Sequence, residues 1–201
     1  KGVVILLPDW QQHSASPKAI NHLRHSMSEN GWVSLSVQPP SSPAKYPIVK
    51  QPSKESAEGP NEQDPLADYK RQLSAVMTSL MDKAQDYPGI HVVVAEGING
   101  ALLTTLYENE ALAAPNALIL LSSFLPDEFS NTQFIERVAK SGYPVLDLSL
   151  TRDNIWVMRS TEARQQLANK HIKVVYRQQI LSASRPNYYP EEELNIAIRS
   201  W

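Results

Sequence analysis

Apolar and polar positions along the chain follow two alternating patterns. Short continuous apolar runs, such as residues 2–7 and 117–121, are typical of strands buried on both faces of a parallel sheet. Longer stretches between them carry apolar residues at helical spacing; in residues 66–87, for example, Leu73 and Met77 belong to one apolar stripe. The pattern therefore predicts strands that alternate with helices.

The predicted elements follow one another in a regular order. Strands are expected at residues 2–7, 32–37, 90–95, 117–122, 144–150 and 172–178. Helices are expected at residues 17–30, 66–87, from the end of the third strand to about 110, 131–141, 155–169 and 191–201. Alternation of this kind favours a parallel sheet with helices on both faces and right-handed crossovers. We expect an α/β fold, a three-layer α/β/α sandwich with a mainly parallel sheet.

One segment interrupts this order. Residues 39–65 are rich in Ser, Lys and Glu and carry prolines at positions 39, 40, 43, 47, 52, 60 and 65. Repeated prolines disfavour both a long helix and a central strand. Because the βα order resumes directly afterwards, we interpret the segment as a mobile excursion within a single domain that spans residues 1–201.

Composition narrows the classes of function. The 201 residues are 42% hydrophobic, which suits one well-buried core, and the net charge of −2 is spread along the chain. This balance disfavours binding of nucleic acid or of an anionic membrane surface. No apolar run approaches the roughly 20 residues that span a bilayer. Cysteine is absent, so disulfides and Cys-type zinc sites are excluded. The chain opens at Lys1 inside a strand, and we expect a signal peptide, further strands or both to precede it.

A sharp turn joins the third strand to the next helix at Glu96-Gly97-Ile98-Asn99-Gly100. The first strand continues into Pro8-Asp9-Trp10-Gln11-Gln12-His13, and the fifth leads into Thr151-Arg152-Asp153. In order and spacing these segments resemble the α/β-hydrolase superfamily. They correspond to its nucleophile elbow, to the loop that supplies half of its oxyanion hole, and to the strand that presents the acid of its triad.

The resemblance implies a degenerate catalytic triad. The elbow position that should hold the nucleophile is Gly97 or, in a register anchored on Gly100, Ile98. The acid position matches Asp153, which could equally be a turn residue or a helix cap. The histidine should follow the last strand, in residues 181–187, where none occurs. Because serine, histidine and acid act as a unit, the resemblance implies a pseudoenzyme.

A narrower resemblance concerns location. Gln11-Gln12-His13, the Gly31-Trp32 strand and the Pro-rich excursion together resemble an uncharacterised bacterial hydrolase-like family whose members carry export signals. This resemblance implies a periplasmic or otherwise exported protein.

Two arrangements would keep chemistry at the carboxyl edge of the sheet. The backbone N–H of Ile98 or Asn99 could bind a carboxylate or sugar oxygen in a relic oxyanion hole. Alternatively, His13 could pair with Ser122 or Ser123, which end a strand at this edge, and rebuild a hydrolase. The ordinary interpretation of these residues, as loop and strand-end positions, stays open.

Asp9, Trp10 and Arg185 are further candidates for binding. Trp10, flanked by Asp9 and Gln11, suits contact with a sugar or peptide, although it could also cover the core beneath the Pro-rich segment. Arg185 lies where the histidine is missing and could bind an anionic group or simply be solvated.

No cofactor is expected. His22 and His25 have helical spacing that could chelate a metal, but no third ligand is evident, so no metal is expected. Neither a G-x-G-x-x-G nor a P-loop follows any strand, which disfavours nucleotide binding.

We therefore expect a non-catalytic α/β-hydrolase-like protein of the bacterial envelope that binds a protein or a small molecule. The alternative is an esterase or peptidase that uses Ser122 or Ser123.

Overall fold

The computed structural model describes residues 1–43, 45–47 and 64–201. Six strands form one parallel sheet: β1 (Gly2–Leu7), β2 (Val33–Ser36), β3 (Ile90–Glu96), β4 (Ala117–Leu121), β5 (Val145–Leu150) and β6 (Tyr176–Leu181). Their order in the sheet is β2-β1-β3-β4-β5-β6, and every neighbouring pair is parallel. The expected α/β fold is confirmed. Most of the predicted excursion at 39–65 lies outside the described residues.

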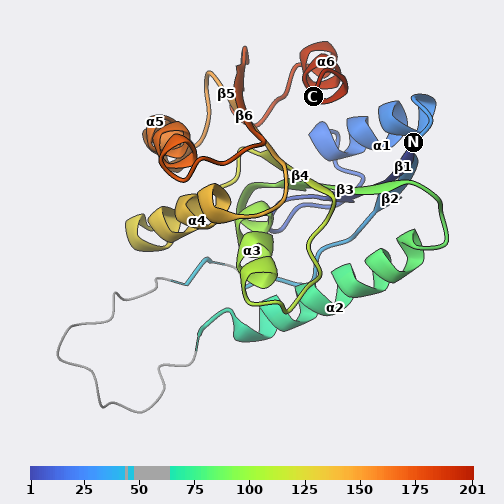
Figure 1. Ribbon diagram of the computed structural model, residues 1–201, viewed down its shortest axis with the longest axis horizontal. Helices are drawn as coiled ribbons and strands as arrows, with labels where there is room; N and C mark the ends of the chain where they lie inside the picture. Colours follow the sequence, from blue (N-terminus) through green and yellow to red (C-terminus); the bar gives the residue numbers. More distant parts are fainter. Residues whose placement is uncertain (44, 48–63) are drawn as a thin grey trace.

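Helices cover both faces of the sheet (Figure 1). They are α1 (Ala19–Glu29), α2 (Ala67–Ala84), α3 (Gly97–Glu108), α4 (Glu128–Lys140), α5 (Ile155–Lys170) and α6 (Glu191–Arg199). Helices α1 and α6 pack on one face of the sheet and form an apolar cluster with it. Helices α2, α3 and α4 form a second apolar cluster with the opposite face. Each interior strand therefore buries both of its sides, which explains why β1, β4 and the middle of β3 consist of continuous apolar residues.

Among the element boundaries that differ from the predictions, two have clear local reasons. Helix α4 begins at Glu128 rather than 131 because the Asp127 carboxylate accepts the N–H of Ser130 at 2.7 Å and caps the helix. Strand β6 begins at Tyr176 rather than 172. Of the apolar residues that suggested an earlier start, Ile172 is 82% and Val174 92% exposed, because this stretch is a loop at the surface.

Because all strands are parallel, every strand begins at one edge of the sheet and ends at the other, the carboxyl edge. The elbow turn, the loop after β1, the end of β4 and the loop after β5 therefore all lie at the carboxyl edge. Among the helices in the described part of the chain, none has the length and apolar character needed to cross a bilayer.

Candidate functional site

Gly97 lies at the elbow, the turn at which strand β3 runs into helix α3. Its φ is +57°, in the left-handed region, whereas Ile98 lies within the helix without a positive φ. In α/β-hydrolases the nucleophile sits at this strained turn between strand and helix. The backbone therefore selects the first of the two sequence registers, in which glycine stands at the nucleophile position.

The space beside Gly97 is filled by Asp9. A β-carbon built on Gly97 would overlap the carboxylate carbon and both carboxylate oxygens of Asp9. Any side chain at position 97 would therefore need Asp9 to move, in addition to adopting a left-handed conformation that favours glycine. Glycine at the elbow and the carboxylate of Asp9 are sterically matched.

The Asp9 carboxylate binds backbone donors at the positions where an α/β-hydrolase has its oxyanion hole. Its Oδ1 accepts the backbone N–H of Ile98 at 2.6 Å and that of Trp10 at 2.6 Å. These donors follow the elbow residue and lie in the loop after β1, the two positions from which α/β-hydrolases build their oxyanion hole. The residue keeps some exposed surface, but burial of its carboxyl group raises the pKa of Asp9 to about 6, against the lowering effect of these backbone hydrogen bonds.

Glu96, directly before the elbow, is a second buried carboxyl group. The residue is 7% exposed, and burial together with the nearby charge of Asp9 raises the pKa of Glu96 to about 7. The charge of Lys18, at the start of α1, acts in the opposite direction. The centre of the carboxyl edge thus holds two interacting acids rather than a nucleophile and a base.

Ser122 and Asp153 contact each other at the ends of β4 and β5. Ser122 Oγ donates to Asp153 Oδ2 at 2.6 Å and lies 2.6 Å from the hydroxyl of Tyr189, which also reaches the carbonyl of Leu148 at 3.1 Å. The pKa of Tyr189 is raised well above its usual value by burial, so the phenol stays protonated. A protonated phenol cannot act as the base that a serine nucleophile needs.

Asp153 also organises its own loop. Its Oδ2 accepts the N–H of Leu150 at 2.8 Å and its Oδ1 that of Asn154 at 2.6 Å. The cap of α5 is Asn154, whose side chain accepts the N–H of Trp156 at 2.9 Å. Asp153 is thus a turn residue bonded to Ser122, and no histidine contacts it within the described residues.

Ser123 is enclosed in the core. It is 0% exposed, and its carbonyl accepts a hydrogen bond from Arg164 Nη2 at 2.6 Å. Arg164 in turn donates to both carboxylate oxygens of Asp147 at 3.1 Å. This buried ion pair, which joins β5 to α5, makes Ser123 part of a structural network.

The proposed partner of these serines lies elsewhere. His13 is exposed, and its Nδ1 accepts the N–H of Ala15 at 3.1 Å, so its ring is engaged within its own loop. The structure places no hydrogen bond between His13 and Ser122 or Ser123, both of which are described in full.

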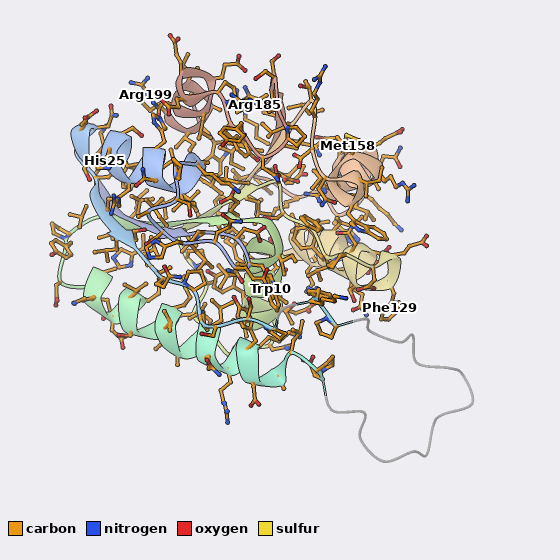
Figure 2. The ribbon with its side chains drawn as sticks, turned by 180° about the vertical axis from the view of Figure 1, so that it is seen from behind. Trp10, His25, Phe129, Met158, Arg185 and Arg199 are labelled. Carbon is orange, nitrogen blue, oxygen red and sulfur yellow. The ribbon has the colours of Figure 1, made fainter. Side chains whose placement is uncertain are left out.

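Trp10 and Arg185 lie on opposite sides of the sheet (Figure 2). Trp10 is 7% exposed and packs against Tyr69, with ring centroids 4.6 Å apart, and against Tyr46 at 5.8 Å. Tyr46 belongs to the Pro-rich segment, so Trp10 covers the core beneath that segment. Arg185 is exposed and lies over the ring of Tyr188 at 5.0 Å. The two residues therefore do not form a common site.

The histidine pair of α1 does not gather further metal ligands. His22 Nδ1 lies 3.4 Å from Glu191 Oε2, and His25 interacts with Arg24. Within the described residues no group of three or more potential metal ligands occurs.

The roles of two side chains that shape the site were not predicted from the sequence. Tyr189 takes a place beside Ser122 from the loop between β6 and α6. Asn99 accepts the Tyr69 hydroxyl at 2.7 Å and donates to the Pro8 carbonyl at 2.9 Å, which ties the elbow helix to the loop after β1. For Asn99, the one indication in the sequence was an asparagine at a position where the elbow usually has a small residue.

Comparison with solved structures finds several proteins of similar fold. The protein is similar to TT1662 from Thermus thermophilus, at 12% identity and a TM-score of 0.67 over 100% of this chain and 89% of that one. It is also similar to an alpha-beta serine hydrolase homologue from Coxiella burnetii, at 11% identity and a TM-score of 0.66 over 100% of this chain and 85% of the other.

A third similar structure is that of Est1E from Butyrivibrio proteoclasticus, at 12% identity and a TM-score of 0.62, with 99% and 87% of the two chains covered. A search of curated proteins finds no match. The model of the family described as "Protein of unknown function (DUF3530)" matches residues 1–201. The chain therefore belongs to the DUF3530 family and has the α/β-hydrolase fold.

Proposed function

We propose that this protein is a non-catalytic α/β-hydrolase-like protein that acts in the bacterial envelope by binding a small molecule or another protein. The observation that carries the proposal is the position of the Asp9 carboxylate. It overlaps the space of a nucleophile side chain at Gly97 and accepts the N–H of Ile98. An oxyanion hole stabilises a transition state by offering unpaired donors to a developing negative charge. Here a fixed negative group already uses them.

The state of Ser122 supports the same proposal. Its hydroxyl is 2.6 Å from both Asp153 and Tyr189, and no imidazole contacts it within the described residues. Ser122 is also 6% exposed. A serine held in this way is a structural donor rather than an activated nucleophile.

Turnover assays test the proposal. The purified protein is incubated with a fluorophosphonate probe and with panels of esters, thioesters and amides, beside an active serine hydrolase as positive control. We expect neither labelling nor turnover above the heat-denatured sample. Reproducible turnover that copurifies with the folded protein would contradict the proposal.

One observation favours a second candidate, a hydrolase that uses Ser122. Ser122 has a φ of +46°, an uncommon conformation for serine, and lies against an acidic side chain at the ligand edge of the sheet. If this candidate is correct, Ser122→Ala abolishes a turnover that the exposed control Ser182→Ala retains. Retention of any turnover in Ser122→Ala excludes it.

The envelope location is tested separately. Cells that express the natural full-length gene product are fractionated, and the protein is detected in periplasmic, membrane and cytoplasmic fractions. We expect it outside the cytoplasm. A purely cytoplasmic protein would refute the location and leave the catalytic question to the turnover assays.

A further inference from the structure

Large apolar side chains that remain exposed are concentrated around β6, an edge strand of the sheet. Ten are exposed among the described residues, and eight of them belong to residues 155–196, which form α5, β6, most of α6 and the loops between these elements. Figure 1 shows α5 and α6 on opposite sides of β6. Exposed apolar side chains that gather on one part of a surface mark interaction sites. Their distribution therefore indicates an interaction surface at this end of the sheet.

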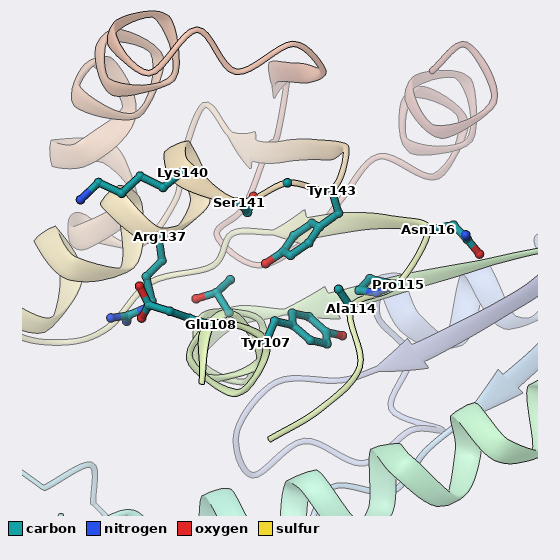
Figure 3. Close-up of a pocket in the computed structure, with 11 residues that line it drawn as sticks. Tyr107, Glu108, Ala114, Pro115, Asn116, Arg137, Lys140, Ser141 and Tyr143 are labelled. Carbon is teal, nitrogen blue, oxygen red and sulfur yellow. The ribbon is translucent and has the colours of Figure 1, made fainter. Parts of the chain in front are cut away.

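The pocket shown in Figure 3 has no comparable excess of one kind of group. It has a volume of about 530 Å³ and lies between the ends of α3 and α4. Its charged side chains have partners of opposite charge, since Arg137 lies 3.8 Å from Glu108 and Lys140 lies 3.4 Å from Glu136. The pocket therefore favours neither an anion nor a cation.

The backbone of β6 has unpaired groups on its outer side. The carbonyl of Val175 accepts the N–H of Val145, on the β5 side, at 3.0 Å. Because peptide groups alternate along a strand, Tyr176, Gln178 and Ile180 direct their N–H and C=O groups away from β5. In the described part of the chain these groups have no hydrogen-bond partner. An edge strand of six residues without proline is a template for another strand.

On one face, β6 is bordered by apolar side chains of its own and of α5. Gln178 Nε2 donates to the carbonyl of Thr161 at 3.0 Å, so this flank of α5 lies over β6. Met158 precedes Thr161 by one helical turn and is exposed on the same flank. Ile180 points to the same side of the strand as Gln178 and is also exposed. A second strand beside β6 would cover both apolar side chains.

On the other face, α6 runs antiparallel to β6 and carries opposite charges at its two ends. Glu193 Oε2 accepts the N–H of Ser182, directly after β6, at 3.2 Å. Arg177, near the start of β6, lies 3.4 Å from the carbonyl of Ser200. Between these two contacts Ile196 is exposed. The surface thus presents an acid at the carboxyl end of the strand, a base at its amino end and an apolar residue between them.

We propose that β6 pairs antiparallel with β6 of a second copy of this chain, about a two-fold axis at Gln178. All three outward residues then form hydrogen-bonded pairs: Gln178 with the partner's Gln178, Tyr176 with the partner's Ile180, and Ile180 with the partner's Tyr176. The contact between Tyr176 and Ile180, formed twice, is an aromatic and β-branched pair of the kind that stabilises neighbouring strands. The two sheets become one, and this goes beyond the proposed function.

The charges of the surface select this register. Antiparallel pairing brings each Arg177 toward the partner's Glu193, because the two residues lie at opposite ends of the strand. A register centred on Arg177 would place two guanidinium groups opposite each other, which is unfavourable. A register centred on Gln179 would lose both pairs between Tyr176 and Ile180. Pairing about Gln178 avoids both faults.

Sedimentation velocity over a range of concentrations tests the pairing. We expect a reversible equilibrium between the 22.5 kDa chain and a species of twice that mass. Ile180→Glu should weaken the association by about tenfold or more, because it places a carboxylate against the partner's Tyr176. Ile90→Glu is the matched control and should leave the association unchanged, since Ile90 is 49% exposed against 51% for Ile180 but lies on β3.

Amide hydrogen exchange identifies the strand and its register. In the associated wild type, the amides of Tyr176 and Gln178 should be protected although they point away from β5. In monomeric Ile180→Glu they should exchange quickly. The amides of Arg177 and Gln179, which point to β5, should stay protected in both proteins and so show that the variant is folded.

If Ile180→Glu does not fold, Gln178→Pro takes its place. Proline removes an outward N–H that has no partner within the described part of a single copy, and it should weaken the association by at least about tenfold. A wild type that stays monomeric at every concentration would overturn the proposal and leave this edge to a strand of another protein. An association that the folded variant leaves unchanged, or rapid exchange of Tyr176 and Gln178 in the associated species, would also overturn it.

Discussion

The carboxylate of Asp9 accepts the backbone N–H of Ile98 at 2.6 Å, across 89 positions of the chain. This hydrogen bond joins the loop after β1 to the first turn of α3 and places a negative group at the positive end of the helix, where it is favoured. It also positions Asp9 against Gly97, so that the identities of the two residues depend on each other.

This dependence predicts how a side chain at the elbow is tolerated. Gly97→Ser should destabilise the fold by about 2–4 kcal/mol, because it combines a left-handed backbone with an overlap on Asp9. It should not create turnover, since no histidine in the described part of the chain contacts the site. Urea unfolding measures the first effect and the ester panel the second.

A double-mutant cycle isolates the steric part. Asp9→Ala removes the overlapping carboxylate, so Gly97→Ser should cost less in that background, with a coupling of about 1 kcal/mol or more. Gly142→Ala is the matched glycine control, since no atom lies within 4 Å of its added carbon, and it should be nearly neutral. Strict additivity of Asp9→Ala and Gly97→Ser would show that the two sites are independent.

The two buried acids predict how stability depends on pH. The pKa of Asp9 rises from 3.8 to about 6 and that of Glu96 from 4.5 to about 7, so the folded chain holds these protons more tightly than the unfolded chain. The associated stability is fully present below the unfolded pKa values and is lost as the pH rises through the folded ones. The free energy of unfolding should therefore fall between about pH 4 and pH 7, by on the order of 3 kcal/mol for each group.

Chemical unfolding across this pH range provides the measurement. The double variant Asp9→Asn and Glu96→Gln should lose most of the slope. Asp9→Asn alone should also lower the pKa of Glu96, because the charge of Asp9 contributes to raising it. An identical pH dependence in wild type and double variant would show that the slope arises elsewhere.

The contacts of Ser122 predict a purely structural effect of its removal. Ser122→Ala and Tyr189→Phe should each reduce the free energy of unfolding by about 1–2 kcal/mol, because each removes hydrogen bonds between buried groups. Since the two hydroxyls lie 2.6 Å apart, the double variant should cost less than the sum. Additive costs would mean that they do not share one hydrogen-bonded network.

The ion pair of Arg164 and Asp147 predicts a larger effect. Both side chains are almost fully enclosed, and Tyr176 also donates to Asp147 at 2.9 Å. Arg164→Met should destabilise the fold by about 3–5 kcal/mol because it leaves a buried carboxylate without its cation. The exposed pair formed by Arg71 and Asp68 is the control, and Arg71→Met should cost less than about 1 kcal/mol. Similar costs for both variants would contradict the assignment.

Periodicity predicts elements well where local pattern and burial agree, as in β1 and α2. It fails at 172–175, where apolar residues lie at the surface and only tertiary contacts, such as those of Lys173, set the chain path. The elbow could be predicted from the sequence because Gly97 and Gly100 directly follow the apolar run of β3. The choice between Gly97 and Ile98 needed a backbone angle.

The candidate site was harder to predict because its contacts are distant in sequence. Asp9 and Tyr189 each act across many positions, on Ile98 and Ser122, and neither bears a local signature of that role. Trp10 showed the converse: an aromatic residue at a ligand edge suited binding, but its neighbours Tyr46 and Tyr69 enclose it.

Because Asp9 is covalently part of the chain, it competes with any dissolved anion as a tethered ligand. Intramolecular groups act at effective concentrations on the order of millimolar or higher, without the entropic cost of association. Carboxylate or phosphonate fragments should therefore not bind at the elbow of the wild type. In a variant that lacks the Asp9 side chain, the backbone N–H groups of Ile98 and Trp10 no longer have this acceptor and are free to bind such a fragment. The protein therefore carries, in Asp9, its own anion for the two amides of this turn.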